Sequence, residues 1–355
     1  MMKKLAIVCG TLHSGGAERV ISIISEKLAE KYDVEIILYY DRKIWYDISD
    51  KVCVTVIERE CKKKSIIARA LWFRKHLKKN ADVVLSFLAP FNIFTLVSSF
   101  GLKIPKIVAD RNDPRCIPSN KVVRAVRDFV YHFATAVVVQ NDNNKKYFSK
   151  SVQKKCSVIF NPVAFQPYKG IALSTEKSEK IVSVGRIIKQ KNNLMLINSF
   201  KNICNEFENL KLVFYGEGNM KPELENRIKE MGIGGKVVFA GNVKDVIDNI
   251  KDARIFVMTS DYEGMPNALL EAMCAGLPVI STKVSGAVDV IESGENGILV
   301  GLNDEKALSD AMRSFLQDEA FAKKCGENAV EVSELLDGDV IMKQWEYVIE
   351  VVLSQ

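Results

Sequence analysis

Short apolar runs, separated by longer stretches with helical spacing, follow one another along almost the whole chain. In the first half they cover residues 5–9, 34–39, 52–57, 82–87, 106–110, 136–140 and 157–160, and in the second half residues 181–185, 211–215, 236–240, 255–259, 278–281 and 298–300. Because these runs do not alternate with polar residues, they are typical of strands that are buried on both faces of a parallel sheet. We therefore expect an α/β fold with doubly wound, Rossmann-like sheets, in which ligands bind beyond the carboxyl ends of the strands.

The length of the chain indicates two such sheets. A chain of 355 residues is too long for one ordinary hydrophobic core and suits two domains of similar size. A more polar stretch over residues 166–180, which contains Pro167 and Gly170, is the natural linker. We predict a first domain over residues 1–165, a second over 181–337, and a separate last segment over 338–355.

Composition favours a cytoplasmic protein. No segment approaches the ~18 uninterrupted apolar residues that a membrane span needs, and the apolar run Leu5–Cys9 is too short for the core of a signal peptide. We therefore expect a protein that is soluble or bound peripherally to a membrane. No Cys-x-x-Cys pair is present, so reduced and mostly buried thiols are expected instead of disulfides or a zinc site. The eight cysteines are Cys9, Cys53, Cys61, Cys116, Cys156, Cys204, Cys274 and Cys325.

Charge is divided unevenly between the two halves. Residues 1–170 hold 30 Lys and Arg against 15 Asp and Glu, and residues 171–355 hold 20 against 29, so a +15 half is joined to a −9 half. Such asymmetry indicates different partners for the two halves. We find no nucleic-acid-binding signature beyond the charge itself, so nucleic acid is not expected as a partner.

The segment Cys61–Asn80 concentrates positive charge among apolar residues. Its cations are Lys62, Lys63, Lys64, Arg69, Arg74, Lys75, Lys78 and Lys79, and its apolar residues include Ile66, Ile67, Leu71, Trp72, Phe73 and Leu77. On a helix, this pattern suits contact with an anionic lipid surface. It equally suits a solvated helix that covers a sheet, and both interpretations stay open.

The turn after the first predicted strand is a candidate phosphate-binding loop. Gly15 and Gly16 are adjacent there, and a helix is expected to begin at about Ala17. Paired glycines at a helix start let the backbone approach a phosphate closely. The segment contains neither Gly-x-Gly-x-x-Gly nor Gly-Lys-Ser/Thr, so the fingerprints of a nicotinamide enzyme and of a P-loop are missing. The two glycines also fit an ordinary tight turn.

Two cations follow the first predicted strand of the second domain. Arg186 comes directly after Gly185, and Lys191 lies five residues further on. At the carboxyl end of a strand, a guanidinium and an ammonium group can together neutralise a diphosphate. An exposed basic loop is the alternative interpretation.

The segment 260–280 carries the strongest chemical signal. Gly264 and Pro266 precede a predicted helix, with Pro266 expected at its first position, so that the amides near residues 264–268 can bind an anion at the positive end of the helix. Glu263 stands in the loop beside this anion site, and Glu271 lies within the helix. The two carboxylates can accept hydrogen bonds from sugar hydroxyls on either side of a diphosphate, although a helix-dipole partner and an ordinary helix residue are alternatives.

At these residues the sequence resembles the retaining glycosyltransferases of family 4, which have the GT-B fold. The resemblance rests on Glu-Gly-Met-Pro-Asn-Ala-Leu-Leu-Glu at 263–271 and Ala-Gly-Leu-Pro-Val-Ile-Ser-Thr at 275–282. It also rests on Ser-Gly-Gly-Ala-Glu-Arg at 14–19, Gly-Arg at 185–186 with Lys-Asn at 191–192, Asn-Pro at 161–162, Gly-Glu-Gly at 216–218 and Glu-Asn-Gly at 295–297. These motifs follow the family's order along nearly the whole chain.

The resemblance implies two facing Rossmann-like domains with the donor site in the cleft between them, and a last helix over Val340–Leu353 that crosses back to the first domain. It also implies a nucleotide-sugar donor, usually a UDP-sugar, and no required metal. Catalytic roles are implied for Glu263, Arg186 and Lys191. The donor would be bound by Gly15, Gly16, Glu217, Gly264, Met265, Pro266, Asn267 and Glu271.

The first domain departs from the family where many relatives carry a His or Glu-His after a strand. This chain has Asp110 and Arg111 there, and we predict that both act on the side of the acceptor or the sugar. The acceptor is expected to be a lipid-linked or growing glycan at the inner membrane surface, as in assembly of a bacterial surface polysaccharide.

Alternative functions also fit parts of the sequence. A nucleotide-sugar epimerase or a catalytically silent sugar-nucleotide-binding protein could share the fold. A metal-dependent transferase needs an Asp-x-Asp motif, but Asp337-Gly338-Asp339 is predicted in a turn far from any strand end. A nicotinamide oxidoreductase would need the glycine fingerprint that is missing.

Overall fold

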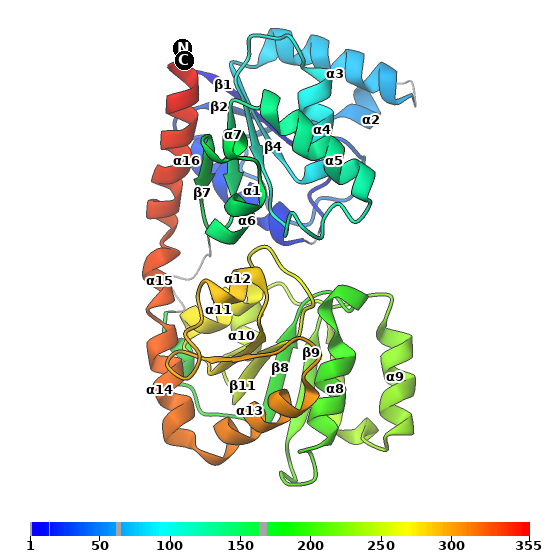
Figure 1. Ribbon diagram of the computed structural model, residues 1–355, viewed down its shortest axis with the longest axis vertical. Coiled ribbons are helices and arrows are strands. Elements are labelled where there is room, and N and C mark those ends of the chain that lie inside the picture. Colours follow the sequence, from blue (N-terminus) through cyan, green and yellow to red (C-terminus); the bar gives the residue numbers. More distant parts are fainter. Residues whose placement is uncertain (1, 14, 62–64, 163–168) are drawn as a thin grey trace. The chain divides into compact units, whose positions relative to one another are not determined.

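The computed structural model describes residues 2–13, 15–61, 65–162 and 169–355. It divides the chain into two compact units, of which unit 1 comprises Met1–Pro162 with Asp337–Gln355 and unit 2 comprises Val163–Leu336 (Figure 1). Ser14, the cations Lys62, Lys63 and Lys64, and residues 166–168 of the predicted linker lie outside the described residues.

Unit 1 is built on a seven-stranded parallel sheet in the order β3-β2-β1-β4-β5-β6-β7. The strands are β1 (Lys4–Cys9), β2 (Asp33–Leu38), β3 (Cys53–Val56), β4 (Val83–Phe87), β5 (Lys106–Ala109), β6 (Ala136–Val139) and β7 (Cys156–Val158). Leu5, Ile7 and Cys9 of β1 face one core cluster, and Ala6 and Val8 face another on the opposite side. Burial on both faces explains why the strands read as continuous apolar runs.

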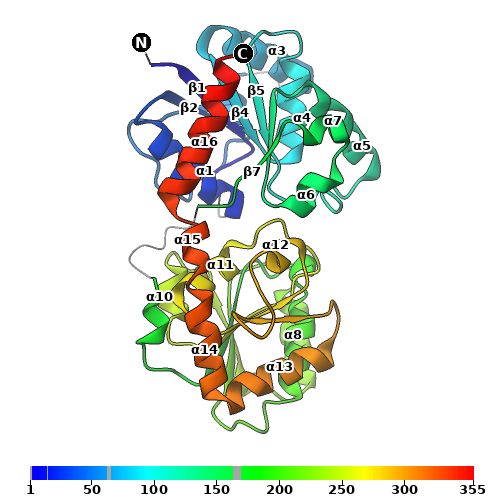
Figure 2. The same ribbon diagram turned by 60° about the vertical axis from the view of Figure 1, so that its left-hand side comes forward.

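Helices cover both faces of this sheet. On one face α1 and α16 share a core with the strands, and on the other α3, α4 and α5 lie in succession (Figures 1 and 2). The helices of unit 1 are α1 (Gly16–Leu28), α2 (Ile57–Glu60), α3 (Ile66–Asn80), α4 (Ala89–Ser98), α5 (Lys121–Val130), the 3₁₀ turn η1 (Tyr131–Phe133), α6 (Asp142–Tyr147), α7 (Lys150–Gln153) and α16 (Gly338–Leu353).

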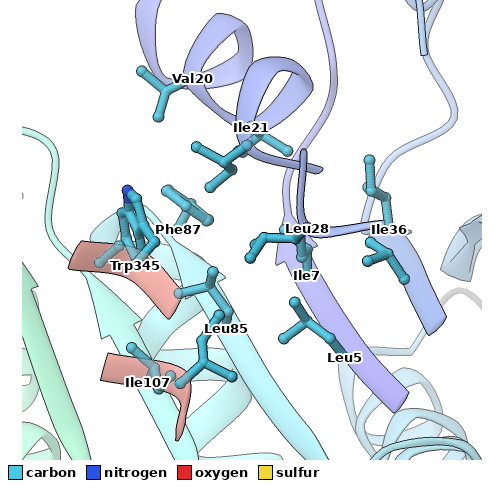
Figure 3. Packing of buried hydrophobic residues seen from close by; sticks show 14 of the residues in the cluster. Leu5, Ile7, Val20, Ile21, Leu28, Ile36, Leu85, Phe87, Ile107 and Trp345 are labelled. Carbon is cyan, nitrogen blue, oxygen red and sulfur yellow. The ribbon is translucent and has the colours of Figure 1, made fainter. Parts of the chain in front are cut away.

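The C-terminal helix α16 is part of the core of unit 1. Its side chain Trp345 is fully buried and lies against Phe87 of β4, with 5.8 Å between the ring centroids (Figure 3). Ile341 and Ile349, one turn away on either side of Trp345, are buried in the same cluster. A helix that is far from β4 in sequence therefore completes one face of the first sheet.

Unit 2 is built on a six-stranded parallel sheet in the order β10-β9-β8-β11-β12-β13. Its strands are β8 (Lys180–Val184), β9 (Lys211–Tyr215), β10 (Val237–Gly241), β11 (Ile255–Met258), β12 (Val279–Thr282) and β13 (Ile298–Val300). Each apolar run of the sequence thus overlaps a strand, and the prediction of two parallel doubly wound sheets is confirmed.

The helices of unit 2 pack on both sides of this sheet, and its buried cluster includes Phe200, Phe214 and Phe315. They are η3 (Ile171–Leu173), η4 (Lys189–Lys191), α8 (Asn193–Lys201), α9 (Lys221–Glu230), η5 (Gly234–Lys236), α10 (Val246–Ile250), α11 (Asn267–Ala275), α12 (Ser285–Val288), α13 (Glu305–Gln317), α14 (Glu319–Ala329) and α15 (Val332–Leu335). The part of the predicted linker that the structure describes folds onto this unit, because Gly170 N donates to Cys274 O and Ala172 is buried.

All eight cysteines are free thiols, and five of them are buried, in agreement with the sequence analysis. Over the described residues, none of the helices combines the length and the apolar character that crossing a bilayer would require.

Candidate functional site

The strand order of unit 2 creates a topological switch point between β8 and β11. Counted from the first strand of the unit, the order is 3-2-1-4-5-6, so chain connections leave β8 and β11 in opposite directions along the sheet. Ligands of doubly wound sheets bind outside the carboxyl ends of the strands at this point. The loops that follow β8 and β11 hold Arg186, Lys191 and Glu263, and the fold therefore brings these three predicted site residues to one edge of one sheet.

Hydrogen bonds fasten these two loops to each other. Asp261 N donates to Gln190 O at 2.8 Å, and Gln190 Nε2 donates to Tyr262 O at 2.8 Å. Asn192 Nδ2 donates to Asp261 Oδ1 at 2.9 Å, and Thr259 Oγ1 donates to Lys191 O at 3.0 Å. The positions of Lys191 and Glu263 are thus fixed by backbone and side-chain bonds on both sides of the switch point.

Lys191 and Glu263 form a close ion pair. Lys191 Nζ lies 2.6 Å from Glu263 Oε1, and only 18% and 12% of the two side chains are exposed. Ser260 Oγ donates to the same carboxylate oxygen at 2.8 Å, and Thr282 Oγ1 donates to Ser260 O at 2.6 Å. Partial burial strengthens such a charged hydrogen bond relative to one at the surface.

Helix α11 begins directly beside this pair. Pro266 is the residue before the first turn, with extended backbone (φ −82°, ψ 99°), and the helix starts at Asn267, one residue later than predicted. Its missing N–H costs nothing there, because the first amides of a helix have no partner within the helix. Because α11 follows the loop that holds Glu263, its positive end lies at the same edge of the sheet as Lys191, and Gly264, Met265 and Pro266 before it are buried.

Glu271 lies on α11 and is only 2% exposed. The structure therefore places the second predicted carboxylate inside the helix layer, while the first stands in the loop before it. The predicted contact of Glu271 with the ribose stays a prediction.

Close backbone packing around the strand ends explains several glycines. A Cβ at Gly216 would collide with Gly185 O, and one at Gly218 would collide with Ile187 O. Gly286, which sequence reasoning missed, packs in the same way against Gly264 O. Its position just after β12 (Val279–Thr282) was the available signal, since glycines after strands of such sheets often mark close backbone approach.

Arg186 and Glu217 are both exposed at this edge. Arg186 follows Gly185, whose φ of +148° is a conformation that other residues rarely adopt. Glu217 forms an exposed ion pair with Lys221 at 3.4 Å. The diphosphate contact of Arg186 and the donor contact of Glu217 stay predictions.

In unit 1, Gly15 caps α1 and Gly16 is its first residue. Tyr46 Oη donates to Gly15 O at 2.9 Å, and Arg19 N donates to the same oxygen at 3.0 Å. The predicted glycine turn therefore stands at a helix start next to the carboxyl end of β1. Its approach to a diphosphate stays a prediction.

Asp110 directly follows β5 and is 1% exposed. Burial raises the pKa of its carboxyl group to about 6, against the opposing effect of the Arg127 charge and the Tyr131 hydrogen bond. Tyr131 Oη donates to Asp110 Oδ2 at 3.2 Å, and Arg127 Nη1 lies 3.8 Å from that oxygen. A carboxyl group with this pKa can exchange a proton near neutral pH.

Arg111 is buried in contacts within unit 1. Its guanidinium donates to Ile159 O at 3.2 Å and to the side-chain oxygen of Asn161, and it lies over the ring of Trp345 at 5.8 Å. Burial lowers its pKa. These contacts link the segment after β7 to α16, and the predicted role of Arg111 on the side of the acceptor or the sugar stays a prediction.

The Asp337-Gly338-Asp339 motif serves a structural purpose. Asp337 caps α16, and its Oδ1 accepts from the amides of Asp339 at 2.9 Å and Val340 at 3.1 Å. Throughout the part of the chain that the structure describes, no group of three or more His, Cys, Asp and Glu side chains is arranged to hold a metal ion.

Comparison with known proteins places these features in a family. The family model described as "Glycosyl transferases group 1" matches residues 165–332. Over 353 residues the chain is 31% identical to the GalNAc-α-(1→4)-GalNAc-α-(1→3)-diNAcBac-PP-undecaprenol α-1,4-N-acetyl-D-galactosaminyltransferase of Campylobacter jejuni, a match that covers 97% of both chains.

Two further similarities extend this result. The amylovoran biosynthesis glycosyltransferase AmsD of Erwinia amylovora is 24% identical over 97% of this chain and 99% of its own. The crystal structure of Anabaena HepE in complex with UDP and glucose matches the fold with a TM-score of 0.83 at 17% identity, over 99% of this chain and 100% of that one. The chain therefore belongs to the group 1 glycosyl transferases, that is, glycosyltransferase family 4, whose members have the GT-B fold.

Proposed function

We propose that this protein transfers a hexose or N-acetylhexosamine from a UDP-sugar to a hydroxyl of a lipid-linked or growing glycan, with retention of the anomeric configuration. The observation that carries the proposal is the position of the Lys191–Glu263 pair at the switch point of unit 2, beside the positive end of α11. A diphosphate and a sugar hydroxyl are the groups that such a combination of cation, helix terminus and carboxylate recognises.

The departing UDP carries the negative charge that develops in the reaction. Lys191 Nζ and the exposed guanidinium of Arg186 supply fixed positive charge at the strand ends, and the first turn of α11 supplies the positive end of a helix. Preorganised charge of this kind is often the largest contribution to catalysis.

Glu263 is proposed to position the sugar and not to act as a nucleophile. Lys191 and Ser260 both contact Oε1, so the carboxylate is held in place. We assign its other oxygen, Oε2, to a hydroxyl of the donor sugar. The acceptor oxygen then bonds to the anomeric carbon on the face from which the UDP phosphate leaves. The bond between that carbon and the phosphate oxygen breaks, and the phosphate oxygen takes the proton of the acceptor hydroxyl.

Two similarities support the choice of substrates. The name of the Campylobacter relative describes a transfer of N-acetylgalactosamine to an undecaprenol-linked glycan. Anabaena HepE was crystallised with UDP and glucose. The +15 charge of residues 1–170 suits an acceptor with an anionic diphosphate at the inner face of the cytoplasmic membrane.

A panel of UDP-, GDP- and ADP-sugars, scored by protection from thermal unfolding, tests the donor. We expect a UDP-sugar alone to raise the unfolding midpoint substantially, because only a ligand that binds the folded state stabilises it. Stabilisation by GDP- or ADP-sugars alone would contradict the UDP assignment.

Incubation of the stabilising donor with and without an undecaprenyl-diphosphate-linked glycan then tests the reaction. A new α-linked glycan only in the presence of the acceptor is the expected result. Conversion of the donor without acceptor would instead identify an epimerase, and binding without any turnover would identify a sugar-nucleotide-binding protein.

A further inference from the structure

Helix α5 of unit 1 exposes its apolar side and buries a charge. Val122, Val126 and Phe129 follow each other at helical spacing and are 71%, 43% and 65% exposed. Arg127, on the opposite side, is 0% exposed. An amphipathic helix on the surface of a water-soluble protein ordinarily buries its apolar side and exposes its charged side. The outward side of α5 therefore suits an apolar environment.

The orientation of α5 is fixed by the buried arginine. Arg127 Nη2 donates to Pro114 O at 3.0 Å and to Asp128 Oδ1 at 2.7 Å, and Nη1 donates to Ile117 O at 2.6 Å. At the helix start, Asn120 Oδ1 accepts from the amide of Val122 at 2.8 Å. Rotation of α5 to bury the apolar side would break the bonds from Arg127 to Pro114 O and Ile117 O, and it would separate Arg127 from Asp110, with which it is paired at 3.8 Å.

Neighbouring aromatic residues extend this exposed surface. Phe133 of η1 is 48% exposed and meets Phe129 edge-on, with ring centroids 5.5 Å apart. Phe100, which follows α4 and is 62% exposed, meets Phe133 at 5.4 Å. We define the α4–α5 patch by its six exposed apolar residues, Val97, Phe100, Val122, Val126, Phe129 and Phe133.

Positive charge surrounds the α4–α5 patch. From residue 65 to residue 133 the sequence holds 12 Lys and Arg against 4 Asp and Glu. The acids Asp110 and Asp113 and the cations Arg111 and Arg127 are buried, whereas Lys103 and Lys121, which are close in sequence to Phe100 and Val122 of the patch, are exposed. The surface thus combines an apolar centre with a cationic surround.

The neighbouring helix α3 adds to this character. It covers the same face of the sheet as α4 and α5 (Figure 2). Its own residues Phe73 and Leu77 are buried against the sheet, and its lysines Lys75, Lys78 and Lys79 are exposed. The two interpretations of segment Cys61–Asn80 are therefore compatible, since α3 both covers the sheet and presents cations to the outside.

We propose that the α4–α5 patch inserts into the headgroup region of an anionic lipid bilayer, with the surrounding lysines in contact with lipid phosphates. The transfer of aromatic side chains from water into that region is favourable, and each Lys or Arg near an anionic surface adds electrostatic attraction. A second copy of the chain is a poorer occupant, because a symmetric pairing of the two patches would bring like charges together. The proposal goes beyond the transfer reaction and does not depend on the identity of the donor.

Flotation of the full-length protein with vesicles tests the proposal. We expect binding to vesicles that contain phosphatidylglycerol and little binding to phosphatidylcholine alone. The double substitution Phe129→Ser and Phe133→Ser removes two inserted rings and should lower binding by about tenfold per ring. Leu302→Ser, which removes a residue that is 48% exposed in unit 2, is the matched control and should leave binding unchanged.

A second measurement locates the insertion directly. Phe129→Trp should show a blue-shifted emission and quenching by brominated acyl chains only when anionic vesicles are present. Equal flotation of the wild type and the double variant, or no quenching of the new tryptophan, would overturn the proposal. A concentration-dependent dimer that the Phe129→Ser, Phe133→Ser variant abolishes, without vesicle binding, would assign the patch to self-association instead.

Protection of these variants by the UDP-sugar separates the two proposals. We expect it to be unchanged in the double variant, because neither Phe129 nor Phe133 is among the predicted donor-binding residues. Loss of vesicle binding in the double variant, with intact donor binding, would therefore support the membrane contact of the patch without testing the reaction. Failure of every nucleotide sugar to protect the wild type would contradict the proposed reaction and leave the proposal for the patch unaffected.

Discussion

Lys191 Nζ contacts Glu263 Oε1 at 2.6 Å, although the two residues are 72 positions apart in the chain. The contact spans the switch point between β8 and β11. In the proposed donor site, the contact holds the cation for the diphosphate next to the carboxylate for the donor sugar. The cation and the carboxylate are therefore expected to act as one unit in catalysis.

Substitutions of the three charged site residues should separate catalysis from folding. We expect Arg186→Ala, Lys191→Ala and Glu263→Gln each to lower kcat/KM for transfer by at least about a hundredfold, because each removes charge stabilisation or sugar positioning. Arg186→Ala should change the free energy of unfolding by less than about 0.5 kcal/mol, since the side chain is exposed. Initial rates and denaturant unfolding provide the two measurements.

The matched control for these variants is Lys189→Ala, which removes an exposed cation from the same loop. Its transfer rate should remain close to that of the wild type. Near-normal turnover of all three site variants would reject the assignment of this edge as the donor site.

Gly286→Ala should damage the site through backbone displacement. The added Cβ would meet Gly264 O and the Cα of Met265, which are backbone atoms that cannot move aside cheaply. We expect weaker donor binding, measured as a smaller thermal shift with the UDP-sugar, and a loss of at least about 1 kcal/mol of stability. Gly235→Ala, where no atom lies within 4 Å of the new Cβ, is the control, and equal behaviour of the two variants would contradict the prediction.

Asp110 should make the free energy of unfolding of unit 1 depend on pH. Burial raises the pKa of its carboxyl from 3.8 to about 6 in the folded state, so the folded protein holds this proton more tightly than the unfolded chain. The contribution of this carboxyl to the free energy of unfolding is therefore largest below about pH 4, and it is lost as the pH rises to about 6.

Asp110→Asn removes this titration. Relative to the wild type, the variant should gain on the order of 2 kcal/mol of unfolding free energy between pH 4 and pH 7. Denaturant unfolding at a series of pH values measures the difference, and a constant offset between the two proteins across this range would show that the carboxyl does not titrate there.

Trp345→Ala should destabilise unit 1. The side chain is fully buried against Phe87, and its removal leaves a cavity that costs about 3–5 kcal/mol. Faster hydrogen exchange in β1 and β4, with unchanged exchange in the unit 2 strands, is the expected result. Tyr347→Ala removes a residue that is 68% exposed on the same helix and should leave exchange unaltered, and an equal effect of both substitutions would argue against core packing of α16.

The strands, the loop positions of the site residues and the state of the cysteines could all be read from the sequence. Each apolar run marks a strand because burial on both faces of a parallel sheet demands local, continuous apolar character. Arg186, Lys191 and Glu263 could be placed at strand ends for the same reason. Patterns of this kind depend only on neighbouring residues.

Other features depend on the tertiary structure alone. Sheet order decides that Lys191 meets Glu263, that Gly286 packs against Gly264, and that Trp345 meets Phe87. The outward orientation of α5 follows from Pro114 O and Ile117 O, carbonyl groups of the preceding loop that Arg127 meets only after that loop has folded beside the helix. Contacts between residues far apart in the chain are set by which elements become neighbours, and the local sequence pattern holds no record of that choice.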